Sequence, residues 1–150
     1  MSPTPELEFL ALTKRGNLTS DEVSVVFEKL KPIKPEHFIG TWLGGCVDTN
    51  HPAAQQLDSM RWAGKTFRST EDVDPIMVYK DDGTRECEES WGHARLRQIE
   101  FRGVVSTAMV YDIHPIIDYF RYVNDSLIAG AMDAKSIPGQ IFYFYLYKGE

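Results

Sequence analysis

The sequence has little cysteine and no long apolar run. Its 150 residues include two cysteines, Cys46 and Cys87, which form no Cys-x-x-Cys motif, so no disulfide framework is indicated. The start of the chain lacks a basic segment followed by an apolar run, which argues against a secretory signal. No segment approaches the ~18 apolar residues of a membrane-spanning helix. We therefore expect a cytoplasmic protein with reduced thiols and no membrane partner.

Positive charge is also scarce. The formal net charge is -6, and no basic stripe alternates with aromatic residues, so a nucleic-acid partner is not expected. Hydrophobic residues make up 43% of the chain and charged residues 25%, which is ordinary for a globular protein. The length fits one domain spanning residues 1–150.

Motifs that hold metals or phosphates are missing as well. The four histidines, His37, His51, His93 and His114, form neither a His-x-His nor a His-Glu-x-x-His pair, so we predict no metal and no haem. No Gly-x-Ser-x-Gly nucleophile motif and no glycine-rich phosphate loop is present. We therefore predict that the protein binds no cofactor.

Apolar periodicity predicts two helices within residues 1–36. The first carries Leu7, Phe9, Leu10 and Leu12 and stops at Gly16-Asn17. The second begins at an N-cap in residues 19–22. Its apolar face then repeats at helical spacing, with Val23, Val26, Phe27 and Leu30.

From residue 37 onward the pattern favours strands. Hairpin signals join residues 75–80 to 84–91, 95–101 to 104–111, and 118–123 to 127–132, and a last strand covers 141–147. About eight short strands indicate a sandwich or barrel. Residues 51–62 fit either a short helix or a loop. We predict a mainly β fold, a single antiparallel barrel over residues 37–150.

The last strand, IFYFYLY, alternates between two kinds of aromatic residue. Phe142 and Phe144 fall on one face, and Tyr143 and Tyr145 on the other. Core packing is the simpler interpretation. The alternative is that the phenolic face, with Tyr143 and Tyr145, lines a pocket.

An ordered set of segments resembles a family named for its GxWxG motif, in which a second domain of unknown function follows. The segments are GTWLGG (40–45), WAGKTF (62–67), FRG (101–103), AMVYD (108–112), PIIDYFRYV (115–123) and GAMDAK (130–135). The resemblance spans roughly residues 20–148. It implies a lipocalin-like barrel but no particular reaction. It also implies that Trp42 plugs the closed end, with direct ligand contact by Trp42 as the alternative.

A charged set lies among the most apolar strands. It comprises Asp112, Asp118, Arg121 and Asp133, with Phe120 between two of them. Buried charges must be paired. They form either a structural ion-pair network or the polar end of an apolar pocket.

Two further groups are candidates for the site. Trp62 and Lys65 bracket Gly64 and could close a pocket mouth, although a strand start with an exposed lysine is the simpler interpretation. His51, three residues after Asp48, could belong to an acid–base pair or merely to a turn.

The function that these patterns favour is binding of one small, mostly apolar molecule inside the barrel. The alternative is a cofactor-independent isomerase or cyclase, with an aspartate or histidine as acid or base. Candidate catalytic residues are His51, Asp112, Asp118 and Arg121. A homodimer is a further possibility.

Overall fold

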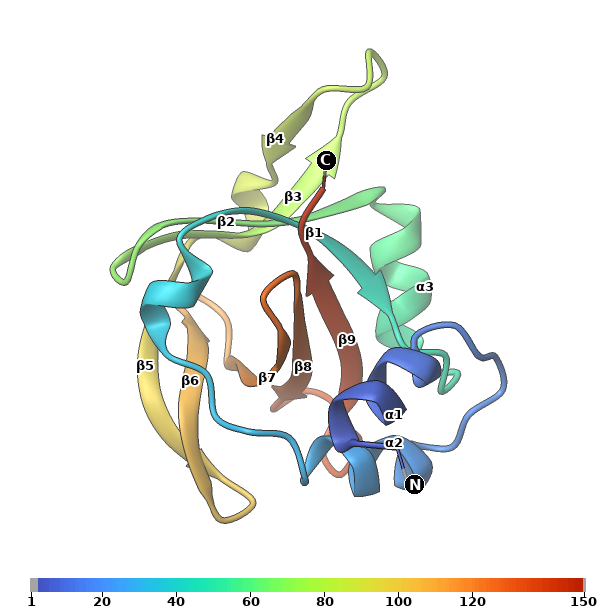
Figure 1. Cartoon of the computed structure of the whole chain (residues 1–150). Coiled ribbons are helices and arrows are strands. Elements are labelled where there is room, and N and C mark those ends of the chain that lie inside the picture. Colours follow the sequence, from blue (N-terminus) through green and yellow to red (C-terminus); the bar gives the residue numbers. More distant parts are fainter. Residues whose placement is uncertain (1–2, 150) are drawn as a thin grey trace.

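Eight antiparallel strands close into a barrel in the computed structural model, which describes residues 3–149 (Figure 1). The sheet has nine strands, of which all but β4 belong to the barrel: β1 (Gly40–Cys46), β2 (Trp62–Ser69), β3 (Asp72–Tyr79), β4 (Arg85–Cys87), β5 (Ala94–Phe101), β6 (Val104–Tyr111), β7 (Ile116–Asn124), β8 (Leu127–Ala134) and β9 (Phe142–Tyr147). Neighbours run in the order β2-β1-β9-β8-β7-β6-β5-β3-β4, and pairing of β2 with β3 closes the ring. The short strand β4 pairs only with β3, in a hairpin that projects from the barrel (Figure 1).

The predicted fold class and hairpins are confirmed. β3–β4, β5–β6 and β7–β8 are antiparallel pairs joined by the expected turns. The helical segments are α1 (Pro5–Leu12), α2 (Ser20–Phe27), α3 (Pro52–Ser59) and the short 3-10 turns η1 (Pro35–Phe38) and η2 (Glu89–Trp91). Residues 51–62, which fitted a helix or a loop, therefore contain a third helix, α3, beside the two that were predicted.

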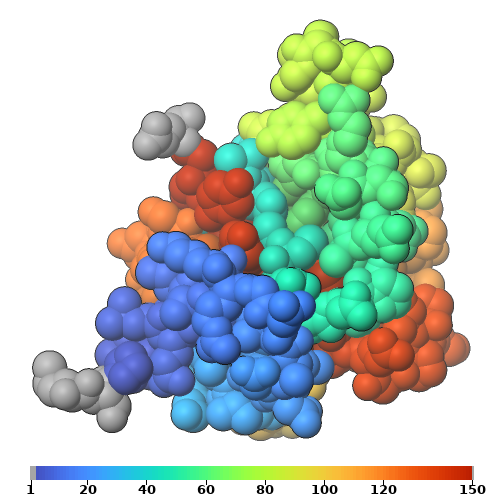
Figure 2. All heavy atoms as spheres, turned by 90° about the vertical axis from the view of Figure 1, so that its right-hand side faces the viewer, coloured from blue at the N-terminus to red at the C-terminus, as the bar shows by residue number. Residues whose placement is uncertain are grey.

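The N-terminal helices pack on the outside of the barrel. α2 starts with a capping box, in which Thr19 and Glu22 satisfy each other's backbone N–H groups. Its apolar face meets the outer side of β7–β9, where Ala129, Ala131 and Tyr143 are fully buried. In the space-filling view the blue N-terminal segment and green α3 lie side by side on the same face of the molecule (Figure 2). Strands β7–β9 are thus buried on both faces, which explains their nearly continuous apolar sequence.

The closed end of the barrel is filled by aromatic side chains. Trp42 is 0% exposed, and its indole Nε1 donates to the Phe38 carbonyl oxygen over 2.7 Å. The Phe38 ring in turn contacts those of Phe67 and Phe120 edge-on, at centroid distances of 5.2 and 4.9 Å. Trp42 thus occupies the floor position that the family resemblance implied.

The segment before η1 seals the gap where β6 and β7 diverge. The backbone of Lys31 forms an isolated antiparallel β-bridge with that of Tyr122. The Ile33 amide donates to Ser106 Oγ, and the Ile33 carbonyl accepts from Thr107. One pass of irregular chain thus satisfies strand groups that would otherwise lack partners.

Glycines in β1 and β2 let aromatic rings and backbone come close. A Cβ at Gly44 would lie 2.3 Å from the Trp62 ring, so the indole of β2 rests directly on the β1 backbone. Gly64 has φ +98°, and a Cβ there would lie 1.9 Å from the Trp42 carbonyl oxygen. The β2–β3 register shifts on both sides of Gly64, which marks a bulge.

Among the described residues, none of the helices has the length and apolar character needed to cross a membrane.

We predict that Gly64→Ala is strongly destabilising because the new methyl group collides with the backbone of Trp42. The matched control is Gly83→Ala. Gly83 also has a positive φ, +85°, but faces open space, so it reports only the conformational term of about 1–2 kcal/mol. Thermal or urea unfolding should show a larger loss for Gly64→Ala. Equal losses would mean that the close approach at Gly64 is unimportant.

Candidate functional site

A cavity of about 70 Å³ lies inside the barrel beneath α3, and Trp42 is not among the residues that line it. Its walls come from α3, η2, the residues after β8, and the inner faces of β2, β3, β6, β7, β8 and β9. The lining residues are Ala53, Gln56, Leu57, Trp62, Lys65, Ile76, Trp91, Tyr111, Ile116, Asp118, Met132, Ala134, Ser136, Ile137, Phe142 and Phe144. The lining is apolar and aromatic apart from a small polar group, which is the usual composition of a ligand site.

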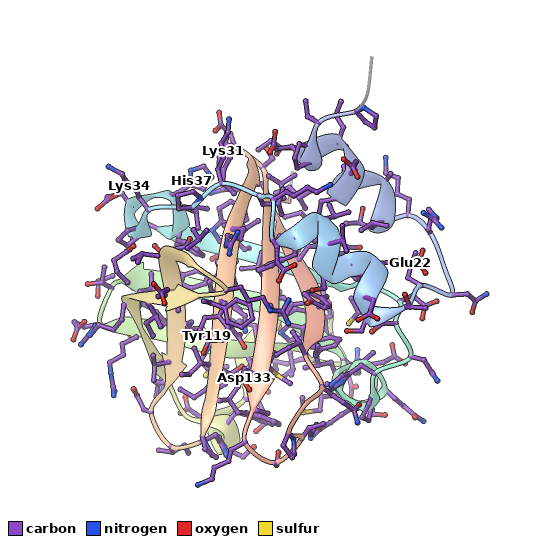
Figure 3. All side chains as sticks on the ribbon, turned by 90° about the horizontal axis from the view of Figure 1, so that it is seen from below. Glu22, Lys31, Lys34, His37, Tyr119 and Asp133 are labelled. Atoms are coloured by element: carbon purple, nitrogen blue, oxygen red, sulfur yellow. The ribbon has the colours of Figure 1, made fainter. Side chains whose placement is uncertain are left out.

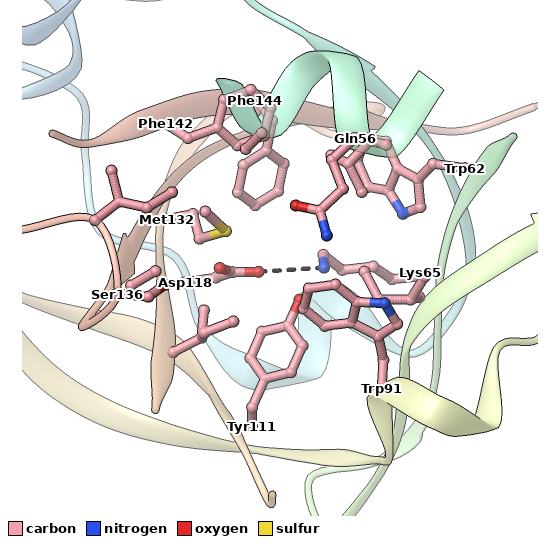
Figure 4. Close-up of a pocket in the computed structure, with 16 residues that line it drawn as sticks. Gln56, Trp62, Lys65, Trp91, Tyr111, Asp118, Met132, Ser136, Phe142 and Phe144 are labelled. Atoms are coloured by element: carbon pink, nitrogen blue, oxygen red, sulfur yellow. Dashed lines mark ion pairs between the residues drawn. The ribbon is translucent and has the colours of Figure 1, made fainter. Parts of the chain in front are cut away.

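The polar group is centred on a buried ion pair. Lys65 Nζ lies 3.1 Å from Asp118 Oδ2, and each side chain is 2% exposed (Figure 4). Lys65 Nζ also donates to the Pro75 carbonyl oxygen over 2.9 Å. The ammonium lies 5.4 Å from the Phe144 ring centroid and 5.7 Å from that of Tyr111. Aromatic faces thus supply part of the solvation that water would give the charge.

The bulge at Gly64 places Lys65 inside the barrel. Trp62 and Lys65 are three positions apart and would point to opposite faces of a regular strand. The register shift at Gly64 lets both side chains line the cavity. Asp118 faces inward without a bulge, because it lies on the same inner face of β7 as Ile116 and Phe120, each two positions away.

Burial controls the acid–base properties of the pair. Desolvation lowers the pKa of Lys65 and raises that of Asp118, and the attraction between them opposes both shifts. Both shifts act in the direction of the neutral forms of the two groups. Burial, helped by the charge of Asp118, raises the pKa of Tyr111 well above its ordinary value. The phenol therefore stays protonated and can donate a hydrogen bond.

Two polar atoms of the site have unused hydrogen-bonding capacity. Within residues 3–149, neither Asp118 Oδ1 nor Trp62 Nε1 has a hydrogen-bond partner, although both are buried. Figure 4 shows the Gln56 amide from α3 turned toward the ion pair. The site therefore offers one strong acceptor and one donor inside an apolar enclosure, where such groups are normally satisfied.

Three of the residues singled out from the sequence come together at this site: Trp62, Lys65 and Asp118. The simpler interpretation of Lys65, an exposed lysine at a strand start, is wrong because the bulge turns it inward. Phe120 and Trp42 also face the interior, but they pack in the closed half of the barrel and do not line the cavity.

The other charged candidates lie outside the cavity and do not form its polar end. Asp112 pairs with Arg95 Nη1 at 2.5 Å, with both side chains more than one-third exposed. Asp133 lies beside Tyr119 on the outer face of β7 and β8 (Figure 3). The charged set therefore splits, because neighbouring positions of a strand point to opposite faces.

Arg121 is the buried charge of the outer core. Its guanidinium donates to the carbonyl oxygens of Leu30 (2.9 Å), Glu28 (3.2 Å) and Phe101 (3.1 Å), and it lies 5.2 Å from the Phe27 ring centroid. It thus satisfies carbonyl groups at the C-terminal end of α2, which have no partners within the helix.

The face of β9 that lines the cavity is the phenylalanine face. Phe142 and Phe144 contact the cavity, whereas Tyr143 is buried against α2 and accepts a hydrogen bond from Arg102 Nη1 at 2.7 Å. Tyr145 lies on the same outer face, over Gly45. The pocket role expected for the two tyrosines is therefore corrected. Their hydroxyls suggested a pocket, but helices cover this face as well.

His51 is the N-cap of α3. Its Nδ1 accepts from the Ala53 amide over 3.0 Å, and its ring packs 5.3 Å from that of Phe142. Burial lowers its pKa, so the imidazole is neutral at pH 7. Asp48 instead accepts from the Asn17 amide, so each member of the expected acid–base pair has a backbone N–H as its partner. His51 therefore positions the helix that covers the cavity.

The sequence reasoning missed several lining residues, chiefly Gln56, Trp91, Tyr111 and Met132. Tyr111 and Met132 could have been found from their strands, because both stand at inward positions near the same barrel end. Gln56 and Trp91 come from α3 and η2, whose placement over the mouth is a tertiary feature without a local signal.

Potential metal ligands converge at one place among the described residues. Atoms of Asp74, Cys87 and His93 lie within 4.8 Å of one another. However, Asp74 already pairs with Arg68 Nη2 at 2.5 Å and with His93 Nδ1 at 3.0 Å. Burial raises the pKa of Cys87 to about 12, so its metal-binding thiolate form is rare. The arrangement suits an ion-pair network, and the absence of a metal stays a prediction. Cys46 and Cys87 are both free thiols.

Fold and site together define a closed eight-stranded β-barrel with a small interior cavity, and the comparisons with known proteins place it more narrowly. A profile described as "GXWXG protein" matches residues 25–83, and one described as "Domain of unknown function (DUF4334)" matches residues 92–148. A protein of known crystal structure from Thermomonospora curvata is 37% identical, with a TM-score of 0.91 over 97% of this chain and 99% of that chain. A search of curated proteins found no match. The chain belongs to the GXWXG family with the DUF4334 domain.

We predict that Arg121→Met lowers stability and leaves the cavity intact. Losing a buried guanidinium that serves several carbonyl oxygens should reduce the free energy of unfolding by about 2 kcal/mol or more. Arg95→Met, which removes a partly exposed ion pair with Asp112, should change it by less than about 1 kcal/mol. Urea unfolding measures both. Retained stability in Arg121→Met, together with lost ligand binding, would return Arg121 to the functional site.

Proposed function

We propose that the cavity binds a small molecule that has an apolar body and one polar group, and that the Lys65–Asp118 pair holds the polar group. The observation that carries the proposal is Asp118 Oδ1. Within the described part of the chain this buried carboxylate oxygen has no partner, although its twin Oδ2 pairs with Lys65. A ligand hydroxyl or amine would supply the missing donor.

The energetics of the pair support a ligand-binding role. Replacing a buried ion pair by apolar side chains of similar volume is often neutral or stabilising. A barrel core needs no charges to fill it, and the lining here is otherwise apolar and aromatic. Packing alone therefore does not account for the two charges, whereas a role in anchoring the polar group of a ligand does.

The volume limits the ligand. The cavity of about 70 Å³ is half the size of the ~150 Å³ apolar cavity that accommodates benzene in an engineered protein. The ligand that fits without rearrangement therefore has only a few non-hydrogen atoms, like a short-chain alcohol or amine. A larger ligand would require movement of the mouth, which consists of α3 and the residues after β8.

We predict that propan-1-ol binds and that the three tryptophans report it. Trp62 and Trp91 line the cavity, whereas Trp42 lies at the closed end. In ¹H–¹⁵N spectra, titration should shift the indole signals of Trp62 and Trp91 and leave that of Trp42 in place. Asp118→Asn should weaken binding, while Asp112→Asn, which alters the exposed pair with Arg95, should not. If all three indoles stay unmoved, or Asp112→Asn is the damaging variant, the proposal fails.

A second candidate function is proton transfer by Asp118 in a cofactor-independent isomerase or cyclase. The observation that favours it is the raised pKa of the Asp118 carboxyl, caused by burial, together with the place of Asp118 in the cavity lining. A carboxyl group tuned in this way can act as a general acid or base near neutral pH.

This second function predicts that the protein moves deuterium from D₂O into a carbon–hydrogen position of a bound ligand. The wild type and Asp112→Asn should catalyse the exchange, detected by mass spectrometry of the ligand, and Asp118→Asn should not. A wild type that binds the ligand but gives only the buffer rate of exchange would leave binding as the function.

A further inference from the structure

We infer that the Lys65 amine forms an imine with a small aldehyde or ketone that enters the cavity. The inference rests on the proposed function and names the ligand class as a carbonyl compound. Its basis is the placement of one amine, one carboxyl group and an apolar space at the same point of the barrel.

The geometry leaves one position on Lys65 Nζ open. An ammonium group has three N–H donors. Here one meets Asp118 Oδ2 and another the Pro75 carbonyl oxygen. The rings of Trp62, Tyr111 and Phe144 also lie around Nζ, with their centroids 5.4–5.7 Å from it. Lys65 and these three residues all line the cavity, so a carbonyl carbon in the cavity can reach Nζ.

Lys65 differs from every other lysine of the chain in its surroundings. The seven others are exposed, while Lys65 is 2% exposed. Desolvation lowers the pKa of its ammonium group, and a lysine amine in an apolar pocket is an activated nucleophile for carbonyl compounds. Asp118 stands next to it to take the proton.

Imine formation requires only the carbonyl compound, Lys65 and Asp118. Lys65 passes a proton to Asp118, and the neutral amine attacks the carbonyl carbon to form the C–N bond. The carbonyl oxygen takes the proton from Asp118, and a carbinolamine results. Asp118, now a carboxylate, takes a proton from the carbinolamine nitrogen and passes it to the hydroxyl group. The nitrogen lone pair then expels that group as water. The iminium that remains is a cation, as the ammonium was.

Conservation of charge favours the product in this enclosure. The iminium stays next to the Asp118 carboxylate, so no additional charge is buried. The cavity volume of about 70 Å³ restricts the carbonyl compound to a short chain.

The test is trapping with propanal and sodium cyanoborohydride, which reduces an imine to a stable alkylated amine. Peptide mass spectrometry then measures the alkylated fraction at each lysine of the intact, folded protein. We expect Lys65 to reach half-labelling at an aldehyde concentration about tenfold below that for exposed Lys80, because desolvation activates the amine. Propan-1-ol should compete with labelling at Lys65 and not at Lys80.

Variants separate the role of Asp118 from general reactivity. Asp118→Asn should lose most Lys65 labelling, and Asp112→Asn should keep it. If Asp118→Asn fails to fold, Asp118→Glu takes its place, and a shifted pH dependence of labelling at Lys65 is then expected with none at Lys80. Unchanged labelling or pH dependence in the folded Asp118 variant overturns the assignment of the proton to Asp118.

The outcomes distinguish this inference from the proposed function. If propan-1-ol shifts the Trp62 signal but Lys65 is labelled no faster than Lys80, imine formation is wrong and binding stands. If neither the alcohol nor the aldehyde acts at the cavity, both fail. Rapid, alcohol-sensitive labelling of Lys65 that depends on Asp118 supports both.

Discussion

A lysine and an aspartate, each 2% exposed, meet 3.1 Å apart inside a barrel that is otherwise lined by apolar and aromatic side chains. Separating two such charges from water is unfavourable, and their attraction compensates only with good geometry and further hydrogen bonds. Lys65 donates such a bond to the Pro75 carbonyl oxygen, whereas Asp118 Oδ1 has none within the described chain. The unpartnered carboxylate oxygen of Asp118 is the basis of the proposed ligand site.

The backbone of β2 positions Lys65 for its ion pair with Asp118. Gly64, with φ +98° and no room for a side chain, breaks the register of β2, so that Lys65 and Trp62 both face inward. Gly44 lies under the Trp62 ring. The glycines around Trp42 and Trp62 therefore serve close packing of indole against backbone, and the packing in turn orients the cation inside the barrel.

Much of the fold followed from the sequence because turn signals, caps and periodicity are local. The hairpin turns at residues 81–83, 102–103 and 124–126 and the N-cap of α2 were visible in this way. Most of the site could not be predicted, because alternation along a strand separates two faces without telling which one is inside. On β9 both faces are buried, one in the cavity and one under α2, and the tyrosine hydroxyl that suggested a pocket binds Arg102. Likewise Asp118 and Arg121 are close in sequence but point into different cores.

The most direct measurement of the central claim is a high-resolution crystal structure of the protein soaked in propan-1-ol. We predict density for the alcohol between Trp62 and Phe144, with its oxygen at hydrogen-bond distance, about 2.5–3.0 Å, from Asp118 Oδ1. A cavity that stays free of the alcohol at saturating concentration, or an alcohol that binds without contacting Asp118, would contradict the claim that this carboxylate anchors a ligand.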